Sequence, residues 1–274
     1  MGQTLIQTLI RTLLAAVLLA PTMASAQTAP MVKSLAPDLP QSFLFIGNSF
    51  YYFNNGFTRH IAGIERGLGG PVHRATMATI GGSGLDWHDV ESYFRPGAVG
   101  SYDFDGKNNI VFAPPGKVYD AAVMMDCSQC PIHPQLAPVF TKSAKLDSDI
   151  VRKHGAVPIL FMSWAYADKP DMTGPLAEAY TKAGNDNGAL VIPAGLAFAR
   201  AQKGRPAIQL YINDNRHPTL AGTYLAAATT YAAIQGRSPE ASTYTAGLDA
   251  DLASYLRSVA WATVQAYFNG SVTN

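Results

Sequence analysis

Three side chains whose chemistry could combine lie near opposite ends of the sequence. Ser49 follows an apolar run in "FLFIGNSFYYFNNG", and Asp214 and His217 share the stretch "YINDNRHPTLAG". A serine hydroxyl is a weak nucleophile at neutral pH, so it needs a base within hydrogen-bond reach and a third group that orients this base. Since two residues separate Asp214 from His217, a turn can place the carboxylate against one ring nitrogen and leave the other nitrogen free. The three residues are therefore candidates for a nucleophile, its base and the acid that orients the base.

Each of the two stretches also has a simpler structural explanation. Gly-Asn-Ser after a strand is typical of a turn, because Gly adopts unusual backbone angles and Asn or Ser caps the following segment. Asp-x-x-His before Pro is typical of a helix start. Both stretches occur where a strand is predicted to end, and this shared placement favours the catalytic interpretation.

A negatively charged reaction intermediate would also need hydrogen-bond donors aimed at it. The backbone N–H of Ser49 is one candidate. Gly82 in "TIGGSGLDWH" is another, because a glycine lets the backbone approach a substrate closely. The structural alternative for Gly82 is a glycine-rich turn between a strand and a helix.

The elements that must position these residues are short apolar runs that alternate with helical patterns, as in βα units around a parallel sheet. Strands are predicted at 43–46, 72–79, 121–125, 157–162, 189–192 and 208–211. Helices are predicted at 57–68, 85–94, 136–153, 175–183, 196–202, 220–234 and 248–268. Two polar stretches, 97–119 and 165–174, interrupt the alternation, and the first is predicted to be a hairpin or a long loop.

The predicted topology brings the candidate residues together. In a parallel α/β sheet, the ligand site lies outside the carboxyl ends of the strands, where loops converge. Ser49 follows the first predicted strand, Gly82 the second and Gln129 the third, while Asp214 and His217 follow the last. We therefore expect these residues to meet at one edge of the sheet.

These motifs resemble the sequence blocks of the SGNH hydrolase superfamily, the GDSL-like esterases and lipases. "FIGNSF" resembles the first block, in a branch with Gly-Asn-Ser in place of Gly-Asp-Ser, "IGGSG" is similar to the second, and "DNRHP" is similar to the last. The resemblance implies Ser49 as nucleophile, Gly82 as an oxyanion donor, His217 as base and Asp214 as its partner. It also implies a flavodoxin-like fold, which is a three-layer α/β/α sandwich with a mostly parallel sheet. No cofactor is required for this chemistry.

The third block is where the chain departs from this family. The family places an Asn or a Gln there as a side-chain donor to the oxyanion, whereas the aligned position in "MMDCSQCP" is Cys127, a poor donor. Gln129 or Ser128 could supply this group after a small shift of the loop.

Aromatic residues lie close to the candidate site in the sequence. Tyr51, Tyr52, Phe53 and Trp87 could line a pocket for an acyl group or a sugar, with Tyr51 and Trp87 as the substrate-binding candidates; alternatively, these rings close the core over the sheet. No metal site is predicted, because no close two-His spacing occurs among the remaining histidines, His60, His73, His88, His133 and His154.

The N-terminus predicts export. Arg11 precedes the apolar run 13–20, and Ala24-Ser25-Ala26 supplies small residues for cleavage, so residues 1–26 are predicted to be a signal peptide. Residues 27–40 form a proline-containing leader and residues 41–274 one domain. The apolar run is shorter than the roughly 20 residues of a membrane span. We therefore expect a periplasmic or extracellular protein without integral membrane association, with an uncleaved anchor as the alternative.

Composition and cysteine content narrow the choice of partners. Hydrophobic residues make up 48% of the chain and the formal net charge is +1, so a nucleic-acid partner is not expected. The two cysteines, Cys127 and Cys130, could form a disulfide in an oxidising compartment.

Together, these features predict an exported serine hydrolase that cleaves carboxylic esters of a small molecule or a glycan. The activity would be of the carboxylesterase or carbohydrate acetylesterase type. One alternative is a non-catalytic module on the same fold that binds a glycan or a lipid beside Trp87. Another is a thiol-dependent protein built on Cys127 and Cys130.

Overall fold

A parallel sheet of five strands forms the centre of the protein. The computed structural model describes residues 28–95, 97–99, 102–105, 107–112 and 116–270. The strand order is β2-β1-β5-β6-β7, and each neighbouring pair is parallel. The strands are β1 (Ser42–Gly47), β2 (Arg74–Thr79), β5 (Ala121–Met124), β6 (Val157–Phe161) and β7 (Leu190–Ile192). The predicted parallel α/β architecture is confirmed.

Burial explains why the central strands appear in the sequence as unbroken apolar runs. Every residue of β5 and β7 is buried, and in β1 only Ser42 is not. A strand covered on both faces needs apolar side chains in both directions. The edge strand β2 is more polar, and only Ala78 in it is buried.

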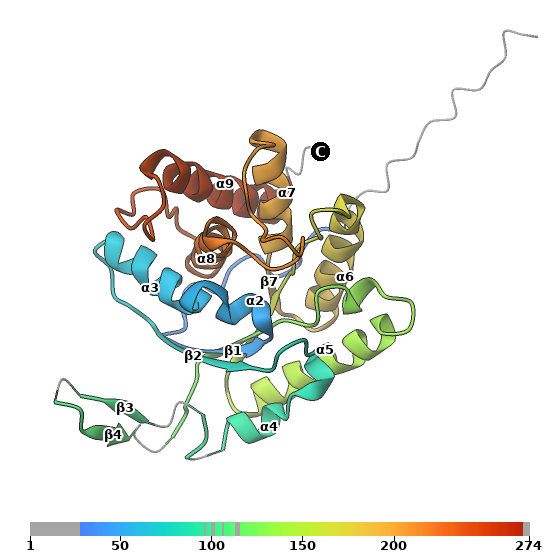
Figure 1. Cartoon of the computed structure of the whole chain (residues 1–274). Coiled ribbons are helices and arrows are strands. Elements are labelled where there is room, and N and C mark those ends of the chain that lie inside the picture. The colour runs from blue at the N-terminus through green and yellow to red at the C-terminus, as the bar shows by residue number, and fades with distance from the viewer. Residues whose placement is uncertain (1–27, 96, 100–101, 106, 113–115, 271–274) are drawn as a thin grey trace, which may run out of the picture.

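Helices cover both faces of the sheet. Figure 1 shows α3, α7, α8 and α9 on one face and α4, α5 and α6 on the other. The longer helices are α3 (Phe57–Gly67), α5 (Ala137–Lys153), α6 (Thr173–Asp186), α7 (Ala194–Gly204), α8 (Leu220–Gln235) and α9 (Ala250–Asn269). The short helical segments are α2 (Ser49–Tyr52), η1 (Phe53–Asn55), η2 (Leu85–Trp87), α4 (Val90–Tyr93), η3 (Cys130–Ile132) and η4 (Pro170–Met172). The predicted three-layer α/β/α arrangement is therefore present.

Helix α8 anchors the loop that precedes it. The helix contacts α3, α7, α9 and β7, and nearly all of its residues are buried. Its N-cap is Thr219, whose hydroxyl accepts a hydrogen bond from the N–H of Gly222 at 3.3 Å. A Cβ atom at Gly222 would lie 2.4 Å from the carbonyl oxygen of Leu210. A glycine here thus allows close packing of the helix against the segment that leads to Asp214 and His217.

The predicted sixth strand at 208–211 is wrong. The segment does not join the sheet, and its single β-bridge is antiparallel and joins Tyr211 to Pro218. The N–H of Thr219 donates to Leu210 at 2.9 Å. The backbone N–H and C=O groups of this segment form hydrogen bonds with the residues that follow it. The segment therefore folds back on itself beside α8, and it does not pair with β7 as a further strand of the sheet.

The predicted helix at 85–94 and the bounds of several other predicted elements also differ from the structure. The predicted helix at 85–94 is divided into η2 and α4, because His88 has extended backbone angles (φ −94°, ψ 128°) and directs its ring into the interior. The predicted strand at 72–79 begins two residues later, at Arg74.

The polar stretch 97–119 contains a hairpin, as predicted. Strands β3 (Tyr102–Phe104) and β4 (Ile110–Phe112) pair antiparallel. Figure 1 shows this hairpin extending away from the body of the domain.

The N-terminal part of the described chain contacts α6. The N–H of Met31 donates to the side chain of Asn185 at 2.7 Å, and the amide of Asn185 donates to the carbonyl of Ala29 at 2.9 Å. The predicted signal peptide, residues 1–26, lies outside the described residues. Within the part of the chain that the structure describes, no helix combines the length and the apolar character needed to cross a membrane.

Candidate active site

The sheet register aligns the loops that carry the candidate residues. Gly47 at the end of β1 pairs with Thr79 at the end of β2, and Ile46 pairs with Met124 at the end of β5. The loops that follow these strands therefore start at the same edge. This is the edge where parallel α/β proteins place their ligand sites.

Ser49 is the first residue of α2, immediately after β1. Asn48 is the N-cap of this helix, and its side-chain oxygen accepts a hydrogen bond from the N–H of Phe50 at 3.2 Å. Gly47 allows the tight turn before it, because a Cβ atom there would lie 2.9 Å from the ring of Tyr51 and 3.1 Å from the side chain of Met125. Gly-Asn-Ser thus forms the turn and helix cap that its residue types favour, and the catalytic role of Ser49 stays a prediction.

The structure brings the three candidate catalytic residues into one hydrogen-bonded chain. Ser49 Oγ lies 2.8 Å from Nε2 of His217, and Nδ1 of His217 lies 2.5 Å from Oδ2 of Asp214. This is the geometry of a nucleophile, a base and an acid that orients the base.

Asp214 is held as a carboxylate. Its Oδ1 accepts hydrogen bonds from the backbone N–H groups of Arg216 and His217, both at 2.9 Å. Burial acts to raise the pKa of Asp214, but hydrogen bonds from the His217 ring and these two N–H groups outweigh it and lower the pKa to about 2. An ionised Asp214 favours the tautomer in which Nδ1 of His217 carries the proton and Nε2 faces Ser49.

Two phenylalanine rings fix the plane of the His217 ring. Phe53 stacks on it with a centroid distance of 4.3 Å and an interplanar angle of 13°, and Phe50 meets it edge-on at 5.6 Å. The role of Phe53 is one that sequence reasoning missed. The signal was the short helix: Phe53 is four residues after Ser49, so the two face the same side of one helical turn.

Hydrogen bonds from the loop after β6 hold the loop of Asp214 and His217 in place. The indole N–H of Trp164 donates to the carbonyl of Arg216 at 2.9 Å, and the N–H of Ala167 donates to the carbonyl of Asn215 at 2.9 Å. Trp164 is itself buried and stacks on Phe50 at 4.4 Å. The loop of Asp214 and His217 is therefore tied to the helix that carries Ser49.

Gly82 lies in a turn after β2, and its role as a backbone donor to an oxyanion stays a prediction. The N–H of Ser83 donates to the carbonyl of Ile80 at 3.2 Å. Gly82 has φ +74°, a conformation that favours glycine. A Cβ atom there would meet nothing within 4 Å, so the glycine is required by the backbone angle and not by lack of space. Ser49 is the first residue of a helix, so its N–H has no acceptor within that helix.

Asn48 connects the loops that follow three strands. Its amide donates to the carbonyl of Ser83 at 3.1 Å and to the carbonyl of Asp126 at 3.2 Å, and the residue is 4% exposed. The turn with Gly82, the helix of Ser49 and the loop after β5 are thus held at fixed relative positions.

His88 reinforces the same connection. Its Nε2 lies 3.0 Å from the hydroxyl of Ser83 and 3.1 Å from the carbonyl of Gly47, and its Nδ1 lies 2.9 Å from the hydroxyl of Tyr93. Burial lowers the pKa of His88, against the opposing effects of the Gly47 carbonyl and Asp86. The neutral ring therefore acts as a structural link between β1 and the Gly82 turn.

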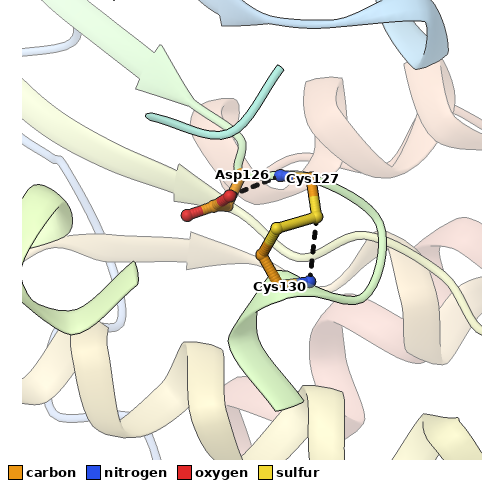
Figure 2. Close-up of side chains that lie close together, drawn as sticks. All are labelled: Asp126, Cys127 and Cys130. Atoms are coloured by element: carbon orange, nitrogen blue, oxygen red, sulfur yellow. Dashed lines mark hydrogen bonds between the residues drawn. A yellow bond between two sulfur atoms is a disulfide. The ribbon is translucent and has the colours of Figure 1, made fainter. Parts of the chain in front are cut away.

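The loop after β5 is closed by the disulfide between Cys127 and Cys130, as predicted. Figure 2 shows the carboxylate of Asp126 beside this disulfide, where it accepts a hydrogen bond from the N–H of Cys127 at 2.5 Å. Gln129 is exposed at the start of η3, and the hydroxyl of Ser128 lies 2.7 Å from that of Tyr166. With its sulfur in the disulfide, Cys127 has no thiol to donate, and a role for Gln129 in the oxyanion hole stays a prediction.

The described residues contain one set of metal-ligating atom types close enough to share an ion, namely Asp126, Cys127 and Cys130. The two sulfurs are bonded to each other and carry no thiolate charge, so this set does not fit a metal. The other described histidines hydrogen bond within the protein: His60 to Tyr244 and Asn54, His73 to Glu65, His133 to the N–H of Gln135, and His154 to Glu91.

The predicted substrate role of Tyr51 is wrong. Its side chain is 1% exposed and stacks on Phe57 at 4.6 Å in the core. It is two residues after Ser49 in the helix, so it points to the opposite side from the nucleophile. Tyr52 and Trp87, in contrast, are 44% and 61% exposed. The substrate role of Trp87 stays a prediction.

Buried carboxylates beneath the site predict a pH-dependent stability. Burial raises the pKa of Asp147 to about 7, with Asp126 and Asp86 adding to the shift, and its Oδ2 has no hydrogen-bond partner in the described part of the chain. The folded state therefore binds this proton more tightly than the unfolded state. As the pH rises from about 4 to 7, the free energy of unfolding of the protein should fall by up to about 1.4 kcal/mol per pH unit, and above this range it should level off.

Asp147→Asn is expected to remove this loss, because the amide has nearly the same shape and no charge. The melting temperature of the variant should exceed that of the wild type by up to about 10 °C at pH 8 and match it near pH 4. Asp149→Asn, on the same helix but exposed and paired with Lys145 at 2.7 Å, is the control and should show no such gain. An equal difference at both pH values would contradict this explanation.

The disulfide is expected to stabilise the loop without taking part in catalysis. A double variant, Cys127→Ser with Cys130→Ser, should lower the free energy of unfolding by about 2 kcal/mol. This loss is at the low end for a disulfide, because the loop that the disulfide closes is short. Denaturant unfolding measures this change. Ester hydrolysis in the double variant should persist. Loss of hydrolysis there, together with full activity in Ser49→Ala, would instead support the thiol-dependent alternative.

Comparisons with known proteins identify the class of fold. Neither the protein-family models nor the curated proteins give a match. A provisionally assigned SGNH hydrolase from Slackia heliotrinireducens superposes with a TM-score of 0.53 at 20% identity, covering 71% of this chain and 98% of that chain. A DUF4886 family protein from Bacteroides uniformis superposes with a TM-score of 0.57 at 19% identity, covering 81% and 94%.

The chain thus has the three-layer fold of the SGNH hydrolases. The family resemblance given by the motifs is confirmed at the level of the fold. A provisionally assigned GDSL-like lipase from Parabacteroides merdae is a further example, with a TM-score of 0.50 at 14% identity and coverage of 76% and 99%.

Proposed function

We propose that this protein is an exported hydrolase of carboxylic esters with Ser49 as nucleophile. The observation that carries the proposal is the chain of hydrogen bonds from Ser49 to His217 at 2.8 Å and from His217 to Asp214 at 2.5 Å. Its position at the carboxyl edge of an SGNH-type sheet adds support.

The proposed cycle has two acyl-transfer steps. Ser49 Oγ attacks the ester carbonyl carbon while His217 accepts the hydroxyl proton, and Asp214 stabilises the resulting imidazolium. The backbone N–H groups of Ser49 and Gly82 would bind the oxyanion. His217 then gives the proton to the departing alcohol, and water activated by the same ring releases the acid from Ser49.

The substrate is proposed to be an ester of a small molecule or a glycan. The rim on the β2 side of Ser49 offers the exposed rings of Tyr52 and Trp87, and such rings pack against acyl chains and sugars alike. Carboxylesterase and carbohydrate acetylesterase activities are therefore both compatible with the site.

A panel of p-nitrophenyl esters of increasing acyl length, run beside acetylated sugars, tests this proposal. We expect turnover of at least one series, with the preferred acyl length identifying the subtype. Absence of turnover in both series by folded, monodisperse protein would contradict the proposed activity.

Export is proposed from the N-terminal sequence. When the full chain is expressed in a Gram-negative host, the protein should appear in the periplasmic fraction with a mass that corresponds to a mature chain starting near Gln27. Retention of the full-length mass in the cytoplasmic fraction would contradict this part of the proposal.

A further inference from the structure

Two cationic side chains are gathered around one aromatic ring beside the candidate active site. The guanidinium carbon of Arg216 lies 4.8 Å from the centroid of the Tyr166 ring, and the ammonium of Lys169 lies 6.0 Å from it. Arg216 is in the same loop as Asp214 and His217, and it is the residue directly before the base. Tyr166 and Lys169 follow β6.

The ring that supports these cations is held in a fixed place. Tyr166 is 4% exposed, and its hydroxyl lies 2.7 Å from that of Ser128 in the loop after β5. The backbone of Arg216 is fixed at both ends of the residue, through its N–H to Asp214 and its carbonyl to Trp164, both at 2.9 Å. The charged side chain of Arg216 therefore extends from a backbone that hydrogen bonds hold in place.

Neither cation has an ion-pair partner among the described residues. Asp168 and Asp171 belong to the same loop and form no ion pair with either cation, while Asp214 is paired with His217 at 2.5 Å. Elsewhere on the surface, side chains such as Lys145, Lys182 and Arg205 each contact a carboxylate. Two like charges held around one ring without a carboxylate leave a place for an external anion.

The strand order gives the site two different sides. Ser49 follows β1, which lies between β2 and β5, and β6 lies beyond β5. On the β2 side the exposed large apolar and aromatic side chains are Tyr52, Ile80 and Trp87, and the exposed carboxylates Asp86 and Asp89 lie in the same segment. On the β6 side the exposed side chains include Arg216 and Lys169, together with Asp168 and Asp171 of the same loop as Lys169. A substrate that spans Ser49 would thus lie between the exposed rings of Tyr52 and Trp87 on one side and the two cations around Tyr166 on the other.

We propose that the preferred substrates are esters that carry a carboxylate, bound by Arg216 with help from Lys169. This inference rests on the proposed function and adds the substrate class to it. The planar guanidinium of Arg216 can form paired hydrogen bonds with a carboxylate through its N–H edge while it lies over the Tyr166 ring. The carboxylate itself is unchanged in the reaction, in which the ester bond alone is cleaved.

Matched ester pairs test this proposal. In the first pair, para-acetoxybenzoate is compared with para-acetoxybenzamide, so that the charge lies on the alcohol side. In the second, the phenyl monoester of adipic acid is compared with the phenyl ester of adipamic acid, so that the charge lies on the acyl side. The measurement is the ratio of kcat/KM within each pair, after subtraction of spontaneous hydrolysis.

We expect one pair to favour the charged member by about fivefold at low salt, in the range of a solvent-accessible ion pair. The preference should decline toward unity at about 0.5 M NaCl, because salt screens this attraction. Arg216→Gln should bring the ratio close to unity, and Arg216→Lys should retain part of it. Lys169→Gln should have a smaller effect, since its ammonium lies farther from the ring, at 6.0 Å.

Lys142→Gln is the control variant. Lys142 is an exposed residue of α5 outside the site, and its replacement changes the net charge by the same amount as Arg216→Gln. The ratio in Lys142→Gln should equal that of the wild type, which separates a local contact from general electrostatic attraction.

The outcomes distinguish this inference from the proposed function. Hydrolysis of the neutral esters without a preference for the charged ones, or a preference that Arg216→Gln leaves unchanged, would overturn the inference alone. Failure of all four esters, together with the p-nitrophenyl panel, would overturn both. A salt-sensitive preference that disappears in Arg216→Gln would support the inference.

Discussion

Replacing Ser49 by alanine is expected to lower kcat/KM for the best p-nitrophenyl ester by about 10⁵-fold. Loss of the nucleophile removes the covalent step altogether, and the remaining activity would come from the oxyanion donors and substrate binding alone. The fold should be unaffected, because Ser49 is only half-buried at the start of α2 and its hydroxyl lies 2.8 Å from His217. Steady-state kinetics and a thermal melt on the same sample measure both properties.

The control for this variant is Ser34→Ala, which changes an exposed serine in the segment before β1. Its kcat/KM should match that of the wild type. A Ser49→Ala protein that retained more than about a tenth of the wild-type activity would show that another group performs the attack.

Removing the base is expected to have the second largest effect. His217→Ala should lower kcat by about 10⁴-fold or more, since Ser49 then has no group to accept its proton. Asp214→Asn should cause a loss of similar order, because an amide in place of the carboxylate favours the wrong tautomer of His217, whose Nδ1 lies 2.5 Å from Asp214. KM should change much less than kcat in both variants.

The pH profile of the wild type separates a role as base from a role in structure. A histidine base predicts a kcat/KM that rises between about pH 5 and 8, because histidines in general exchange their proton in this range. Asp214, with a pKa of about 2, stays ionised throughout this range and should add no further step. A flat profile over the same range would contradict the assignment of His217.

The sequence was most informative where the chain is buried. Strands β1, β5, β6 and β7 are covered on both faces, so each appears as an apolar run that can be recognised without knowledge of the fold. The segment 208–211 contains a similar run, yet it forms a single antiparallel bridge to Pro218. The local sequence pattern does not reveal whether the backbone of such a segment hydrogen bonds to a strand of the sheet or to residues next to it in the sequence.

The candidate triad could be predicted because its chemistry depends on residue types that stand out in a sequence. The direction of each side chain could not be predicted in the same way. Tyr51 was expected at the substrate site, but α2 begins at Ser49 and turns Tyr51 into the core. The same helical turn brings Phe53 onto the His217 ring at 4.3 Å.

The hydrogen bonds that connect the loops could not be predicted from sequence patterns either. Asn48 contacts the carbonyls of Ser83 and Asp126, which are far from it along the chain. His88 has an unremarkable sequence context, yet its ring lies 3.1 Å from the carbonyl of Gly47. Such contacts depend on the register between β1, β2 and β5, which no single segment encodes.

The most direct test of the central claim is covalent labelling with a fluorophosphonate probe. Such probes react with a serine that an adjacent base activates, and they require no knowledge of the natural substrate. We predict stoichiometric labelling, with the adduct found by peptide mass mapping on Ser49 and absent in Ser49→Ala. A folded wild-type protein that remains unlabelled, or that carries the adduct on another residue, would contradict the assignment of Ser49 and favour a binding module on the same fold.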